Sequence, residues 1–167
     1  MKETLSKQSK ETRCYIMSAI LVFQGFNKID AMTEIKGEMT LDVLGLTKED
    51  IKSFPVPDYS QIVSHLRPIS DPEVRHWVIT NTYSPVLKSR KVEAQNAFYN
   101  FCSDLGWDSK EIKETMELTE ELDGLKPIKP SGGAGNNGGY TPPKNSNSGC
   151  ASMIALIIIS SLLFAIM

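Results

Sequence analysis

The C-terminal segment of the chain, residues 151–167, constrains the structure most, because none of its 17 residues carries a charge. A helix of this length extends about 25 Å, near the lower limit for crossing a hydrocarbon core of about 30 Å. Beginning the helix at Cys150 or Ser148 closes the gap. A buried core helix is the alternative, but no later sequence folds over this segment. We therefore expect a C-terminal transmembrane helix over residues 150–167.

A segment rich in glycine, proline and asparagine, residues 124–149, precedes this run. Such a composition buries too little apolar surface to offset its ordering entropy. We expect a flexible linker of about 25 residues, with a typical end-to-end span of roughly 25–30 Å. Its only charged residues, Lys126, Lys129 and Lys144, favour the cytoplasmic side of a membrane.

The position of the hydrophobic run predicts the topology of the chain. Because the run ends at the last residue of the sequence, it leaves the ribosome only when synthesis ends, so its insertion is expected to be post-translational. The sequence thus predicts a tail-anchored protein that is inserted in a lipid bilayer. Residues 1–149 are expected to stay in the cytoplasm.

The same tail also fits a signal for lipid-anchor attachment, in which the tail is removed. That route requires a signal peptide, and the apolar stretch Cys14–Phe23 has about the right length for one. No small-x-small cleavage site follows the stretch, and none of the eight asparagines lies in an Asn-x-Ser/Thr sequon. We favour a first core helix here and keep a lipid-anchored surface protein as the alternative.

Residues 1–123 are predicted to form an all-α domain, a compact bundle of six or seven helices. Capping residues such as Thr47, Asp58 and Asp108 mark helix starts, and Gly45 and Gly106 mark helix ends. No stretch alternates like a strand. The expected helices cover residues 7–24, 31–45, 47–52, 58–66, 89–105 and 108–122, together with one that starts at the capping box 70–73 and carries Val74, Trp77, Val78 and Tyr83.

An internal repeat relates residues 44–52 to residues 105–113, with four identities in nine positions. Each copy combines a helix end, a glycine cap, an N-cap residue and a new helix, which suggests a duplication. An amphipathic helix lies upstream of each copy. In the first of these helices, Ile35, Met39 and Val43 share one stripe.

Two sets of residues follow a common order of helix, short loop, helix with an early glutamate, and Leu-Gly-Leu-like turn. The first set comprises Ile16–Phe26, Asn27–Asp30, Glu34 and Leu44–Leu46, and the second comprises Trp77–Tyr83, Val92–Glu93 and Leu105–Trp107. This order resembles the TerB-like (tellurite-resistance) helical fold, which also occurs at the front of some membrane-attached J-domain cochaperones.

The resemblance covers residues 10–118 and implies two related helical units, with a stress-related role. Acidic loops in that family can bind cations. This chain departs from the family pattern because both loops lack the Asp-Gly pair, and because residues 84–91 are basic where members often carry acids.

Asp30 and Glu34 stand at positions i and i+4, so both side chains can face one cation. Two carboxylates without further oxygen ligands make a poor calcium or magnesium site. We therefore expect Asp30 to cap the helix and Glu34 to lie near its positive end, with no metal bound.

Catalytic motifs are not apparent in the sequence. His65 and His76 are 11 residues apart and far from any cysteine, and Cys102 lies in an aromatic helix face typical of a buried thiol. We find no glycine-rich phosphate loop, serine-hydrolase elbow or paired-carboxylate motif. The sequence therefore predicts a non-enzymatic protein without a cofactor.

Charge and cysteine content exclude further classes. A net charge of −2 gives no global field for nucleic acid, and three cysteines are too few for a disulfide scaffold. The basic cluster Lys88, Arg90 and Lys91 and the acidic residues 111–121 suit either docking surfaces or solvated faces. Cys150, at the expected membrane boundary, is a candidate for palmitoylation or an unmodified residue. Together these features predict a membrane-tethered interaction module for an unidentified protein partner.

Overall fold

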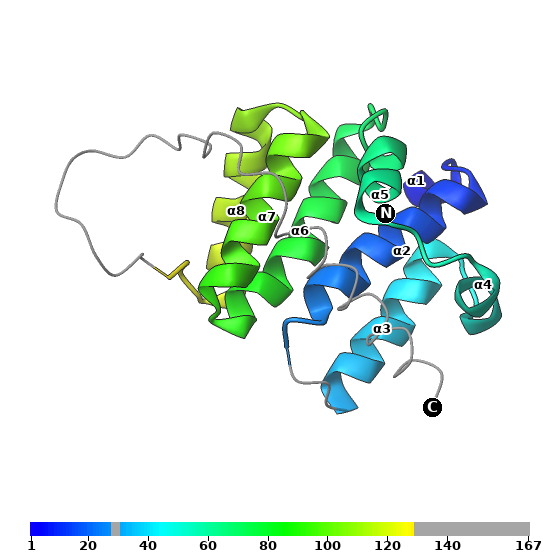
Figure 1. The fold of residues 1–167 in the computed structure, drawn as a ribbon, viewed down its shortest axis with the longest axis horizontal. Helices are drawn as coiled ribbons and strands as arrows, with labels where there is room; N and C mark the ends of the chain where they lie inside the picture. The colour runs from blue at the N-terminus through cyan, green and yellow to red at the C-terminus, as the bar shows by residue number, and fades with distance from the viewer. Residues whose placement is uncertain (28–30, 129–167) are drawn as a thin grey trace, which may run out of the picture.

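The computed structural model describes residues 1–27 and 31–128, and this part of the chain is all-helical (Figure 1). It contains eight helices and no strand, so the all-α prediction is confirmed for the described residues, with one helix more than expected. The helices are α1 (Lys2–Ser6), α2 (Lys10–Gln24), α3 (Ala31–Leu44), α4 (Lys48–Ser53), α5 (Tyr59–Leu66), α6 (Pro72–Ser89), α7 (Val92–Leu105) and α8 (Ser109–Asp123).

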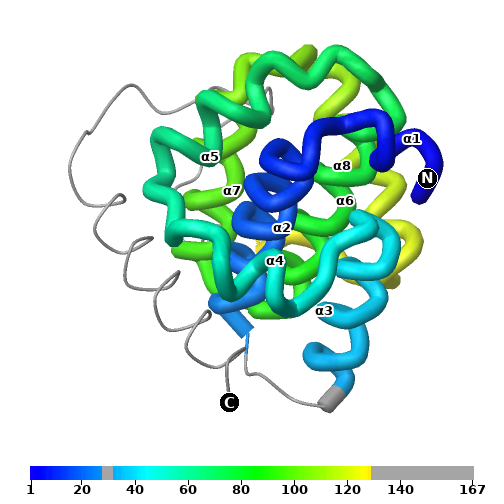
Figure 2. The backbone as a smooth tube through the Cα atoms, turned by 90° about the vertical axis from the view of Figure 1, so that its right-hand side faces the viewer, coloured from blue at the N-terminus to red at the C-terminus, as the bar shows by residue number. Residues whose placement is uncertain are grey.

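Four long helices form a row in the order α3, α2, α6, α8, each packed against the next (Figure 1). Helices α5 and α7 pack against each other and cover one side of α2 and α6. The short helix α1 packs on α3 and α6 from the other side (Figure 2). Helices α1, α3, α5, α7 and α8 therefore surround α2 and α6, whereas α4 lies at the edge of the molecule (Figure 1).

Helix α2 is the centre of the hydrophobic core. All seven residues from Cys14 to Ile20 are buried, which fits a sequence that is apolar on every face of the helix. Phe23 continues the core, with its ring 5.7 Å from the ring of Phe98 and 5.3 Å from that of Phe101. The apolar stretch Cys14–Phe23, weighed above as a signal peptide, here lies in a core helix.

The predicted helix starts are largely confirmed. Side chains of Thr47, Asp58, Asp71 and Asp108 accept hydrogen bonds from backbone N–H groups in the first turn of α4, α5, α6 and α8, respectively. These bonds satisfy donors that a helix end leaves unpaired. The prediction succeeds here because a capping signal lies within three residues of the backbone groups that it serves.

The boundary between α6 and α7 differs from the prediction. A helix was expected to open at Ser89, but α6 continues to Ser89 and α7 begins at Val92. Arg90 makes the turn in a left-handed conformation with φ 53°. Pro85 lies inside α6 even though it cannot donate a helical hydrogen bond. Buried residues on both sides of Pro85, such as Tyr83 and Val86, hold this part of α6 against the core.

Helix α3 is oriented differently from its predicted stripe. Ile35 and Met39 are 51% and 64% exposed, and Val43 is only partly buried. Thr40 and Leu44 face the interior instead. The helix bounds were predicted closely, but the stripe did not identify the core-facing side, because α3 carries apolar residues on two faces.

The two repeat copies have the same local structure. Gly45 has φ +61° and ends α3, whereas Gly106 has φ +66° and ends α7. Each is flanked by two buried apolar residues: Leu44 and Leu46 in the first copy, Leu105 and Trp107 in the second. Glycine suits both positions because other residues rarely adopt this left-handed conformation.

Candidate interaction surfaces

The basic cluster near the end of α6 binds the C-terminal end of α8 through an ion pair and a hydrogen bond. Lys88 Nζ lies 2.7 Å from Asp123 Oδ1, and Arg90 Nη1 donates to the backbone carbonyl of Lys126 at 2.6 Å. Lys126 Nζ in turn lies 3.3 Å from Glu120 Oε2. Two of the three cationic side chains of the basic cluster, for which the sequence left a docking surface or a solvated face open, therefore bind residues of the chain itself.

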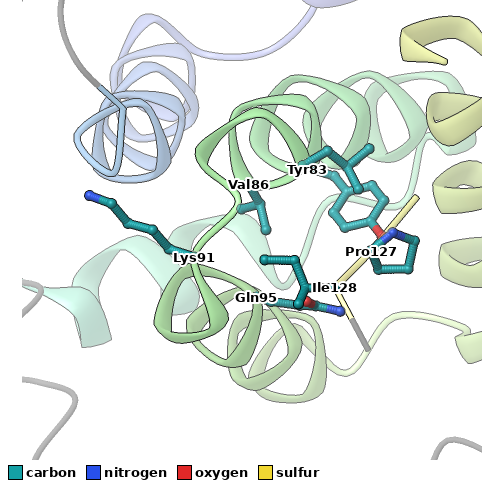
Figure 3. Close-up of a pocket in the computed structure, with 7 residues that line it drawn as sticks. Tyr83, Val86, Lys91, Gln95, Pro127 and Ile128 are labelled. Carbon is teal, nitrogen blue, oxygen red and sulfur yellow. The ribbon is translucent and has the colours of Figure 1, made fainter. Parts of the chain in front are cut away.

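A shallow hollow lies beside this contact, where the described chain ends (Figure 3). It encloses about 190 Å³, including space open to solvent. Figure 3 shows the Lys91 side chain extending away from the hollow. Since Pro127 and Ile128 form one wall, packing extends beyond the expected domain end at residue 123. The lining residues are Tyr83, Val86, Leu87, Lys91, Gln95, Pro127 and Ile128.

Tyr83 links the floor of the hollow to α8. Its side chain is fully buried, and its hydroxyl donates to Glu120 Oε1 at 3.0 Å. Burial, with smaller contributions from nearby Tyr99 and Glu120, raises the pKa of Tyr83 well above its usual value. The phenol therefore stays protonated and remains a hydrogen-bond donor.

The interface between α6 and α8 is polar along much of its length. In the paired residues, the residue numbers increase in the same direction along both helices, so α6 and α8 run parallel. Helix α7 connects them in the chain and runs in the opposite direction. Such bonds fix the register of two helices more specifically than apolar packing alone. The pairs are Arg75–Glu111 at 2.9 Å, His76–Thr115 at 3.0 Å, Thr80–Thr119 at 3.5 Å and Tyr83–Glu120 at 3.0 Å.

The acidic residues of α8 have basic partners at several positions. Glu111 pairs with Arg75, while Glu114 and Glu117 approach Lys110 and Lys113 at 3.8 and 3.9 Å in i,i+4 pairs. Such exposed helix pairs are screened by solvent and contribute little stability. The arrangement matches the solvated-face alternative for this acidic run more closely than an unpaired acidic docking surface.

An apolar strip on the outer side of α3 is the largest exposed hydrophobic feature of one helix in the described residues. We call Met32, Ile35 and Met39 the α3 stripe; they are 58%, 51% and 64% exposed. Their spacing of three and four residues places them on one face of the helix. A second, shorter pair, Leu118 and Leu122, is exposed on α8.

The thiols within the described residues are protected from reaction. Cys14 and Cys102 are both free and buried. Burial raises the pKa of each thiol, most strongly at Cys102, so neither forms a thiolate readily. His65 stacks on Tyr15 with ring centroids 3.8 Å apart, in a packing contact.

Several predicted features lie outside the described residues. These are Asp30 of the candidate cation pair, Cys150, and the hydrophobic run 151–167. Glu34 lies in the first turn of α3, as expected. In residues 1–27 and 31–128, no three His, Cys, Asp or Glu side chains gather as metal ligands. No helix in those ranges is long and apolar enough to cross a membrane.

Comparisons with known protein families, curated proteins and solved structures identified no relative of this chain. No protein-family model matches the chain, and neither a curated protein nor a solved structure matches it significantly. The described residues thus define an all-α protein by their own geometry.

Proposed function

We propose that this chain is a tail-anchored helical interaction module without catalytic activity. The observation that carries the proposal is the uncharged run 151–167, which follows a helical domain packed as far as Ile128. Residues 129–149 would act as the tether and residues 150–167 as the membrane anchor. Such a tether holds a domain near membrane partners at high effective concentration.

The fastening at the end of α8 supports a tether that begins at a defined point. The Lys88–Asp123 and Arg90–Lys126 contacts hold residues 123–126 against the C-terminal end of α6. A pull on the linker therefore acts first on these contacts and not on the core. The linker would therefore leave the domain at one fixed place, the C-terminal end of α8.

We also propose that the domain consists of two related units, α1–α4 and α5–α8. Helices α3 and α7 each have 14 residues and end in left-handed glycines. Equivalent helices make equivalent contacts. Helix α2 packs on α3 of its own unit and on α5 of the other, and α6 packs on α7 of its own unit and on α1 of the other. The last helices differ, since α4 has 6 residues and α8 has 15. The TerB-like relationship and its stress-related role remain predictions.

Removal of residues 150–167 tests the anchor. In cells, the full chain is expected in the membrane fraction and to resist carbonate extraction. The shortened chain is expected in the supernatant and still folded, with the helical circular dichroism and cooperative unfolding of the domain that ends at Ile128. If the shortened chain still remains in membranes, the anchor is assigned wrongly.

Intact mass decides between this proposal and the lipid-anchored surface protein. The proposal predicts that the mature chain retains residues 10–24 and the peptide 153–167. Loss of both, with a lipid mass at a new C-terminus upstream of the removed tail, would establish the alternative.

A further inference from the structure

We propose that the α3 stripe is a docking surface for the chain's own segment 151–167 when that segment is not in a bilayer. This inference rests on the proposed function, because it concerns the aqueous state of the proposed anchor. The α3 stripe would cover part of the tail's apolar surface until a membrane replaces it.

The α3 stripe has the form of a helix-binding surface. Met32, Ile35 and Met39 span two turns, or about 10 Å along the helix axis. Methionine is unbranched and adapts to different apolar shapes, so two methionines around one isoleucine suit a partner of irregular surface. An apolar helix such as that expected for residues 151–167 can align its leucines and isoleucines with this strip.

Two acids that border the α3 stripe are already paired within the chain. Glu38, one turn from Ile35, pairs with Lys48 at 2.7 Å. Asp42, one turn from Met39, pairs with Lys2 at 2.7 Å. Because these acids are already neutralised within the chain, they offer little attraction to a basic ligand. The tail has no charged side chain to place beside them.

The linker is long enough to bring the tail to the α3 stripe. Ile128, the last described residue, lies beside Val86 near the end of α6. At this same end, the side chain of Asn27 donates to the carbonyl of Pro85 at 2.9 Å, and α3 starts four residues later at Ala31. About 21 linker residues span roughly 25 Å as a random coil. The tail is then held near the stripe at an effective concentration in the millimolar range.

A second copy of the chain suits the α3 stripe less well. A stable dimer buries about 800 Å² per partner, contributed by about 20–30 residues. The α3 stripe offers three exposed apolar side chains. An intramolecular segment needs far less area, since the linker has already removed most of the entropy cost of association.

Methionine oxidation tests the proposal, because Met32 and Met39 are themselves the probes. The full chain in dilute buffer is treated with hydrogen peroxide, and sulfoxide formation is followed by peptide mass. Both methionines are expected to oxidise severalfold more slowly than in the full-length variant Ile158→Asp with Leu162→Asp, whose tail is charged. Phosphatidylcholine vesicles should raise the rates of the unmodified chain to those of this variant.

A matched pair of substitutions locates the contact. Ile35→Glu puts a carboxylate in the middle of the α3 stripe and should abolish the protection of Met32 and Met39. Leu118→Glu, on α8 and similarly exposed at 49%, should leave the protection intact. Exposed Met1 serves as a control for oxidant dose.

The outcomes separate this inference from the proposed function. Equal oxidation rates with and without a charged tail would overturn the docking, even if the full chain floats with vesicles. Protection that rises with protein concentration would also overturn it and indicate a second copy as the occupant. Tail-dependent protection without vesicle flotation would support the docking and contradict the membrane anchor.

Discussion

Gly45 and Gly106 occupy equivalent turns but have different neighbours. Both have positive φ values, +61° and +66°. A Cβ atom on Gly45 would lie 2.9 Å from Arg13 Nη1, whereas one on Gly106 would have no neighbour within 4 Å. Arg13 Nη1 donates to the carbonyls of Leu44 and Gly45 at 2.5 and 3.2 Å. Gly45 therefore leaves room for a side chain that caps the end of α3.

Gly106→Ala is expected to destabilise the protein by about 1–2 kcal/mol, the cost of a left-handed conformation for a residue with a side chain. Gly45→Ala is expected to cost more, because Arg13 must also move away from the carbonyls that it binds. Urea unfolding of the two variants measures the difference. In an Arg13→Met background the two costs should become similar; a larger cost for Gly106→Ala would contradict the argument.

Asp50 makes the stability of the helical domain sensitive to acid. A hydrogen bond from Lys10, followed by the bonds from Thr47 at the start of α4, lowers the pKa of Asp50 to about 2 from the usual 3.8. Because the pKa of Asp50 is lower in the folded chain than in the unfolded chain, its carboxylate stabilises the folded state at pH values above the unfolded-chain pKa. This contribution is therefore complete above about pH 4 and is lost as the pH falls toward 2.

Asp50→Asn is expected to lower the urea midpoint at pH 6 and to have a diminishing effect between pH 4 and pH 2. The asparagine oxygen can still accept the Thr47 N–H bond, so the change mainly removes the charge that pairs with Lys10 at 2.6 Å. Urea titrations at several pH values provide the measurement. An effect of constant size from pH 6 to pH 2 would show that the carboxylate charge is unimportant.

At the scale of helices, features set by neighbouring residues were predicted well, whereas features set by residues distant in the sequence were not. The starts of α4, α5 and α8 follow from Thr47, Asp58 and Asp108, because a capping side chain acts within its own turn. The left-handed turn at Arg90 has no comparable signal, since an arginine there is unfavourable and is held by its bond to Lys126.

The candidate surfaces were predicted only in part. Lys88 and Arg90 stand out in the sequence as a basic cluster, but their partners Asp123 and Lys126 lie about 35 residues away, and no spacing rule connects them. The exposed side of α3 was missed for a related reason. A hydrophobic stripe indicates that a face is apolar and does not indicate whether the domain itself covers that face.

Tyr83 contributes to the parallel contact between α6 and α8. Tyr83→Phe is expected to cost about 1.5–3 kcal/mol, because a part-buried hydrogen bond to the Glu120 carboxylate is lost. The amides of α8 should then exchange faster in hydrogen-exchange measurements. Tyr59→Phe removes an exposed bond to Asp104 of 2.6 Å and serves as the control. A smaller loss for Tyr83→Phe than for Tyr59→Phe would contradict the importance of this part-buried pair.

For the whole molecule, the proposed topology predicts a protease pattern. Protease added to the cytoplasmic face of intact membranes should cut the linker near Gly132–Gly139, where the composition favours an extended, accessible chain. A short protected fragment beginning near Cys150 should remain. Protection of the entire helical domain, with cleavage only from the opposite face, would support the lipid-anchored surface protein instead.

The short helix α1 connects the beginning of the chain to both halves of the domain. Leu5 is fully buried, Thr4 Oγ1 donates to Glu73 Oε2 at 2.9 Å, and Lys2 pairs with Asp42. A fluorescent reporter joined directly to Met1 would compete with these contacts for space. Imaging experiments on the full chain therefore need a spacer between reporter and helix, because displacement of Leu5 from the core would change the packing of α1 on α3 and α6.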